Sequence, residues 1–201
     1  KLSSFPDEKT MSDLSFAPCV TEVTIISPIL PTHSRRECAV PFLNAAELIS
    51  HAEKSGLEMW QLAALYEAKR GNMSEEEVFA KMSEIAAIME HCVDEGLKGT
   101  EYKDRILGRQ SHLIDEEKKK LIPCSMINSV IKSITAVMEV KSSMGVIIAA
   151  PTAGSCGCLP GTVIGAARQM NMTHEDITKA LLAAGLIGIF IAHSATFAAE
   201  V

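Results

Sequence analysis

The chain has 201 residues, of which 47% are hydrophobic and 22% charged, and its formal net charge is -6. This length is sufficient for a domain with a sizeable hydrophobic core. The negative charge and the lack of a basic stripe argue against a nucleic-acid-binding protein, which needs clustered Lys and Arg. Aromatic residues make up only 4% of the chain, which favours helix packing over a β-sandwich.

The six cysteines form no CxxC pair, so the sequence predicts neither a zinc ribbon nor a thioredoxin-type motif. A disulfide framework is not expected at this length, and no signal peptide is recognisable at the start. We therefore expect reduced thiols in a cytoplasmic protein.

Residues 1–41 differ in character from the rest. They contain one β-branched run, Val20 to Ile26, which is followed by Pro28 and Pro31. This pattern predicts an extended arm or linker, with one short strand at most. Residues 42–201 are expected to form a helical domain.

Within that domain, capping residues and apolar residues at helical spacing predict a series of helices. The predicted helices run from Asn44 to Gly56, from Glu58 to Arg70, from Ser74 to Gly96, from Pro123 to Val140, from Leu159 to Met170, and onward from Thr173. The charged stretch 101–121 is expected to be a solvated helix face or loop. Periodicity does not decide whether "MGVIIAAP" is a short buried strand or an extended segment.

The apolar run "ALLAAGLIGIFIA" lies in the last predicted helix. It is shorter than the roughly 20 residues that cross a membrane, so we expect a buried core helix and no membrane partner. The predicted fold is mainly α, a helical bundle around this buried helix. Because the helical pattern continues to the last residue without a C-cap, we also expect the natural sequence to extend further and this piece to self-associate.

The segment "APTAGSCGCLPG" consists largely of small residues, and its Pro160 suits the first turn of a helix. Cys156 and Cys158 would then lie at a helix N-terminus, which favours thiolate over thiol and attracts anions. Three chemical uses follow: a thiolate ligand to a metal or cluster, a carboxylate or phosphate cradle, and a redox nucleophile. A purely structural turn is the alternative.

The run "MGVIIAAPTAGSCGCLPG", with "SATFAAEV" after the next helices, resembles the α region of the iron-sulfur L-serine dehydratases. "PFLNAAELISHAEKSGLEMWQLAALYEAK" resembles the opening of the same region, so the resemblance covers residues 42–201. It implies a lyase that converts L-serine to pyruvate and ammonia, in amino-acid degradation and gluconeogenesis. By the same match Cys156 would ligate a 4Fe-4S cluster, whose open iron acts as a Lewis acid on the serine hydroxyl.

The resemblance also implies a site for substrate. Thr152, Ala153, Gly154 and Ser155 are candidates to hold the serine carboxylate through N–H and hydroxyl donors. His193 is a further candidate, either as a polar contact to substrate or as the base that removes the α-proton; a satisfied core histidine is the simpler interpretation.

The family's other cluster cysteines would follow Val201, and the β region's motif is not present. One cysteine does not hold a four-iron cluster, so we expect this piece to be free of cluster and inactive by itself, and to need a β region or β subunit. Two alternatives stay open: a cluster-dependent lyase for L-threonine or L-cysteine, and a non-catalytic α-helical assembly module.

Overall fold

The computed structural model describes residues 8–15, 38–103, 105–116 and 121–195, and this part of the chain is helical with no β-strand. The mainly α prediction is confirmed. The predicted strand at 20–26 lies outside the described residues, and residues 145–151 form an irregular connection. The helices are α1 (Glu8–Ser15), α2 (Ala45–Ser55), α3 (Met59–Gly71), α4 (Glu75–Lys98), α5 (Leu113–Glu116), α6 (Ser125–Ser142), α7 (Cys158–Gln169) and α8 (His174–Ser194).

Three helices begin where their capping residues predict. The side chain of Asn44 accepts a hydrogen bond from the backbone of Glu47 at the start of α2. Ser74 opens α4 and Thr173 opens α8, each with a reciprocal capping box. Each cap satisfies backbone N–H groups that have no partner within the helix, so local sequence is sufficient to place these starts.

The predicted end of α4 at Gly96 is wrong. The helix continues to Lys98 and ends at Gly99, and Gly96 is buried inside it. A Cβ atom at position 96 would lie 2.3 Å from the carbonyl oxygen of Ala136. Gly96 therefore allows α4 and α6 to cross closely, and it does not stop the helix.

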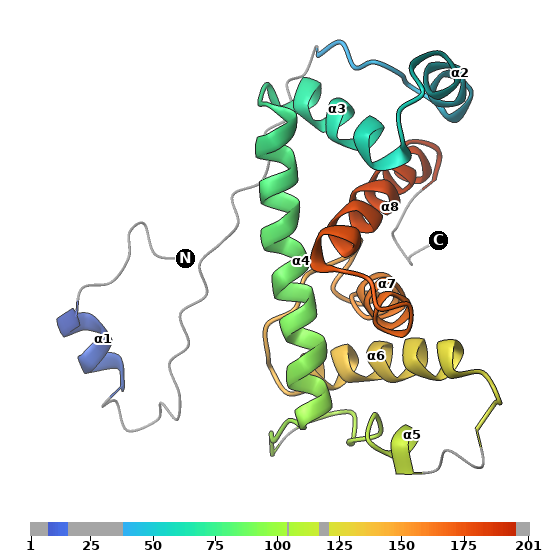
Figure 1. The fold of residues 1–201 in the computed structure, drawn as a ribbon. Helices are drawn as coiled ribbons and strands as arrows, with labels where there is room; N and C mark the ends of the chain where they lie inside the picture. Colours follow the sequence, from blue (N-terminus) through green and yellow to red (C-terminus); the bar gives the residue numbers. More distant parts are fainter. Residues whose placement is uncertain (1–7, 16–37, 104, 117–120, 196–201) are drawn as a thin grey trace.

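Helix α4 is the longest and contacts both halves of the bundle. In Figure 1, α3 and α8 lie against one part of α4, whereas α6 and α7 lie toward its other end. The chain of hydrogen bonds from Ser83 to His174 and on to Glu90 fixes the start of α8 to α4, with 2.8 Å between Ser83 Oγ and His174 Nε2.

The buried side chains form two clusters. The cysteine core joins α4, α6, α7 and the start of α8, and it includes Cys92, Val137, Cys156, Ile164 and Leu181. The aromatic core joins α2, α3, the start of α4 and the later part of α8, and it includes Phe42, Tyr66, Leu62, Val78 and Leu186. The rings of Phe42 and Tyr66 are stacked, with centroids 5.5 Å apart.

Two glycines let α7 approach α6 very closely. A Cβ atom on Gly161 would lie 2.5 Å from the backbone nitrogen of Ile134, and one on Gly165 would lie 2.8 Å from the carbonyl oxygen of Ser129. Ser129 Oγ also donates a hydrogen bond to the carbonyl of Gly165, at 2.9 Å. This crossing holds the segment before α7 against the C-terminal half of α6.

Helix α6 also carries a buried carboxylate. Glu139 is only 1% exposed and accepts hydrogen bonds from the backbone N–H groups of Gln110 and Ser111, both at 2.7 Å. The apolar spacing along this helix predicts that Ile127 and Ile131 lie on its buried side, but each is 44% exposed. The buried face of α6 is therefore partly polar, and it fixes the connection from α4.

Helix α8 is long and apolar enough to cross a membrane by length and composition alone. One side packs on α3, α4 and α7, as expected of a core helix. Burial is incomplete, since Ile187 and Ile191 are 50% and 49% exposed. The helix at the centre of the predicted bundle is thus buried on one side and open on the other.

Candidate functional site

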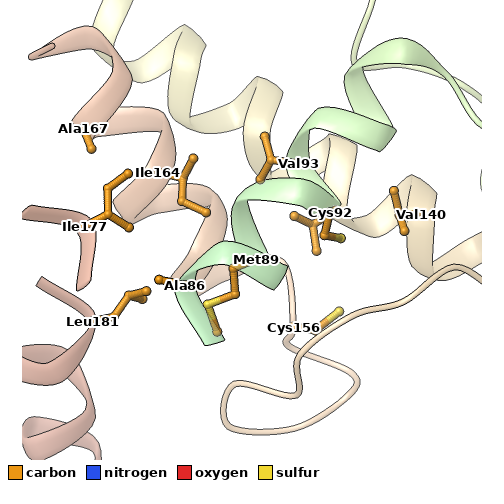
Figure 2. Packing of buried hydrophobic residues seen from close by; sticks show 11 residues of the cluster. Ala86, Met89, Cys92, Val93, Val140, Cys156, Ile164, Ala167, Ile177 and Leu181 are labelled. Atoms are coloured by element: carbon orange, nitrogen blue, oxygen red, sulfur yellow. The ribbon is translucent and has the colours of Figure 1, made fainter. Parts of the chain in front are cut away.

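The small-residue loop connects α6 to α7 and lies at the edge of the cysteine core (Figure 2). The crossing of the two helices positions its ends, because Gly157, the N-cap of α7, packs against Met138 of α6. The predicted helix start is confirmed: α7 begins at Cys158, and Pro160 lies in its first turn. The peptide bond between Ala150 and Pro151 is cis.

Two of the four predicted substrate-binding residues hold the loop in shape. The hydroxyl oxygens of Thr152 and Ser155 are 3.0 Å apart, and each hydroxyl also accepts a hydrogen bond from the other residue's backbone N–H. These hydroxyls are already engaged with each other. The hydroxyl groups of Thr152 and Ser155 therefore stabilise the turn between them.

The other two residues, Ala153 and Gly154, form the exposed tip of that turn. Within the described part of the chain, neither backbone N–H has a hydrogen-bond partner. A Cβ atom at position 154 would meet only the hydroxyl of Thr152, at 3.5 Å, so the tip is open on its outer side. Two adjacent free N–H groups at an uncrowded turn can donate to a carboxylate.

The thiol of Cys156 points into the protein. The residue is fully buried (0% exposed), and Figure 2 shows its side chain on the face of the loop that is directed toward the cluster containing Cys92 and Val140. Burial raises the pKa of Cys156, an effect that the nearby charge of Lys141 opposes. The predicted preference for thiolate is therefore wrong for this arrangement, because loss of water outweighs the electrostatic effect of the helix start.

Cys92 is the cysteine neighbour of Cys156 in this core. Burial, together with Cys156, raises the pKa of Cys92 to about 12. Cys158 is exposed, although it is only two residues from Cys156. The two cysteines of the CGC sequence thus face different environments, as expected when only one of them supplies a ligand or packs in the core.

Lys141 is the residue near Cys156 that the sequence did not single out. It lies in the last turn of α6, and its positive charge favours the thiolate of Cys156. Fifteen positions separate the two residues, so no local motif links them. Only the return of the chain from α6 to α7 brings the lysine and the cysteine together.

The structure does not bring His193 to this loop. His193 is exposed, next to the end of α8, whereas Ile177 at the other end of that helix shares the cysteine core with Cys156. Sixteen residues of helix between them span about 24 Å. The neighbours of His193 along α8, such as Phe190, pack in the aromatic core.

The described residues do not fit a four-iron cluster by themselves. Among them, no group of three or more His, Cys, Asp or Glu side chains is arranged to hold a metal ion. Cys92 and Cys156 are two thiols in an apolar core, and Cys158 faces solvent. Any cluster bound by Cys156 needs ligands from outside the described residues and exposure of its thiol toward them.

The fold is a helical domain with a small-residue turn at the edge of one of its two cores. Residues 54–201 match the family model of the serine dehydratase alpha chain. Because this match covers most of the sequence, the chain belongs to the serine dehydratase alpha chain family. The matched region includes the loop, the α6–α7 crossing and α8.

Individual relatives agree with the family match. The chain is 27% identical over 157 residues to a probable L-serine dehydratase alpha chain of Bacillus subtilis, a match that covers 77% of this chain and 52% of that protein. It is 30% identical over 159 residues to the L-serine dehydratase alpha chain of Peptoniphilus asaccharolyticus, which covers 77% and 54%. L-serine dehydratase 1 of Escherichia coli is 27% identical, with 74% and 34% covered. The chain thus spans about half the length of the two alpha chains.

Proposed function

We propose that this chain is the substrate-holding part of an L-serine dehydratase, which converts L-serine to pyruvate and ammonia. The observation that supports this most directly is the open turn at Ala153 and Gly154, within the segment that matches the alpha chain family. Its free N–H groups would bind the serine carboxylate, and the hydroxyls of Thr152 and Ser155 would keep the turn in shape.

The reaction removes the α-proton of serine and breaks the bond between the β-carbon and the hydroxyl oxygen, so that water leaves. The resulting aminoacrylate takes up a proton to become an imine, and water hydrolyses the imine to pyruvate and ammonia. The turn would contribute by holding the carboxylate at a fixed position while these bonds change. The base that takes the α-proton is not assigned, since no hydrogen bond or ion pair among the described residues links His193 to the turn.

We propose further that the active enzyme contains a 4Fe-4S cluster and a β region or β subunit. Cys156 would provide one thiolate, and the remaining ligands would come from outside the described residues. Support comes from the sequence resemblance and from relatives whose names identify them as alpha chains. The cytoplasmic location and the self-association expected from the sequence stay predictions.

The test is anaerobic purification of the native complex that contains this chain, followed by assays with three substrates. Pyruvate release from L-serine, with little 2-oxobutanoate from L-threonine or sulfide from L-cysteine, is the expected result. A preference for L-threonine or L-cysteine would show that L-serine is the wrong substrate. Inactivity toward all three would overturn the proposal.

A matched pair of variants tests the cluster separately. Cys156→Ser should lose bound iron and its visible absorbance, whereas Cys158→Ser should keep both, because Cys158 faces solvent. Unchanged iron content in Cys156→Ser would contradict the ligand assignment and leave the substrate assay to stand on its own.

A further inference from the structure

Away from the loop, helices α3, α4 and α8 enclose a groove of about 370 Å³. Its walls are apolar, with Val78 and Met82 from α4 and Leu182, Leu186 and Ile189 from α8. This volume lies within the range of small-molecule sites, which are mostly apolar with a few polar groups. The groove adjoins the aromatic core and shares no residue with the loop at 150–157.

Three charged side chains line the groove. Arg70 and Glu67, both on α3, form an ion pair: Arg70 Nε donates a hydrogen bond to Glu67 Oε2 at 3.1 Å, and Arg70 Nη2 lies 2.8 Å from the same oxygen. Burial raises the pKa of Glu67, and the nearby charge of Arg70 opposes that shift. Arg70 and Glu67 therefore largely neutralise each other.

Lys81 is the third charge, and it makes no ion pair within the described part of the chain. Its acidic neighbours on α4, Glu77 and Glu84, do not line the groove. The lining of the groove thus carries one positive charge that no ion pair among the described residues neutralises, beside an apolar channel. A ligand that complements both features has a hydrocarbon body and a single carboxylate.

Gly185 shows that the channel has room for such a body. It lines the groove from α8, and a Cβ atom built on it meets nothing within 4 Å. In a helix interior glycine costs about 0.5–1 kcal/mol relative to alanine. Here the missing side chain leaves open space at the lining of the groove, which a side chain as large as leucine would partly occupy.

We propose that this groove binds an aliphatic monocarboxylate, with the hydrocarbon chain between α4 and α8 and the carboxylate at the ammonium group of Lys81. Medium-chain fatty acids and branched-chain 2-oxo acids share this chemistry. The site is separate from the proposed serine site, so a bound carboxylate would act on the helices around α8 and would not compete with serine for the turn.

The experiment is titration of the purified full chain with octanoate, followed by calorimetry and by NMR of methionine and isoleucine methyl groups. We expect saturable binding that shifts the methyl signals of Met82 and Ile189 and leaves that of Ile131, an exposed residue of α6 that does not line the groove, unchanged. Affinity should rise about fourfold per added methylene from butanoate to octanoate, because each buried methylene contributes a similar hydrophobic free energy. A parallel titration with 4-methyl-2-oxopentanoate distinguishes the two ligand sources.

Two glycine variants locate the site. Gly185→Leu should fill the channel and weaken octanoate binding at least tenfold. Gly188→Leu is the matched control: it makes the same change on the same helix, also in open space, but position 188 does not line the groove. Gly188→Leu should therefore bind octanoate as the natural chain does. Equal affinity in the two variants would overturn the proposal.

The charge is tested with Lys81→Gln and with octylamine. Lys81→Gln should lose about tenfold in octanoate affinity, and octylamine should bind the natural chain more weakly than octanoate does. Octylamine binding as tightly as octanoate would overturn the proposal. The proposal would also be overturned if octanoate did not bind and sedimentation showed a dimer that Gly185→Leu dissociates. In that case a second copy of the chain would occupy the groove.

Discussion

Gly161 and Gly165 of α7 face the backbone of α6, whereas Gly185 and Gly188 of α8 face open space. Both pairs lie inside helices. In α7 the missing side chains let two helices touch, which positions the loop and Cys156. In α8 they leave open space, and the groove lies at the first of them, Gly185. Glycine thus allows close helix packing in one region of the molecule and leaves open space in another.

The two regions differ in a second way. The cysteine core contains no aromatic ring and includes sulfur and small aliphatic side chains, and beside it lies a buried polar network around Glu139. The aromatic core has stacked rings and an adjoining groove. Close packing with a buried carboxylate tolerates little change, whereas a region with open space can accept new side chains.

The largest expected effect is in the closed region, at Glu139. Glu139→Leu removes the acceptor for the backbone N–H groups of Gln110 and Ser111 and leaves Arg105 without its ion-pair partner at 4.0 Å. We expect a loss of about 3–5 kcal/mol in the free energy of unfolding, measured by urea denaturation. Glu139→Gln keeps one carbonyl acceptor and should lose less; equal losses would show that the hydrogen bonds contribute little.

The glycine comparison predicts effects of opposite sign. Gly161→Ala places a Cβ atom against the backbone of Ile134, which no side-chain rotation relieves, so we expect a loss of about 1–3 kcal/mol. Gly188→Ala gains helix propensity without a clash and should stabilise the chain by about 0.5–1 kcal/mol. Thermal unfolding of the two variants side by side measures both. Stabilisation by Gly161→Ala would mean that α7 and α6 do not cross as closely as described.

The next effect is smaller and concerns the helix starts. Hydrogen bonds from the Thr173 hydroxyl and backbone N–H lower the pKa of Asp176 at the start of α8. A carboxylate whose pKa is lower in the folded chain stabilises the fold above its unfolded pKa, and this contribution is lost as the pH falls below about 4. Asp176→Asn should lower the melting temperature at pH 7 and reduce the further loss on acidification. An identical acid profile in both chains would contradict the cap.

The smallest expected effect concerns the chemical reactivity of two thiols in one loop and does not involve stability. Cys158 is exposed, whereas Cys156 is buried and its pKa is raised. In the chain without bound metal, iodoacetamide at pH 8 should modify Cys158 at least about tenfold faster than Cys156, because the thiolate is the reactive form. Peptide mass spectrometry over time distinguishes the two sites. Comparable rates would show that the loop exposes Cys156 readily.

The sequence by itself determined the helical class, the starts of α2, α4 and α8, and the start of α7, whose first turn contains Pro160. These features depend on hydrogen bonds and on apolar spacing between residues that are close in sequence. A short segment of sequence is therefore sufficient to predict each of them. The family resemblance was equally local, because it rested on a few short runs, above all the loop of small residues.

Tertiary structure alone decided what those residues face. Gly96 was expected to end a helix, and Ile127 and Ile131 were expected to be buried; the crossing of α4 and α6 made Gly96 an interior contact, while both isoleucines remained exposed. The burial of Cys156, its approach to Lys141 and the distance of His193 follow from how α6, α7 and α8 pack. Burial and charge are properties of neighbours brought together from distant parts of the chain, and no local pattern contains them.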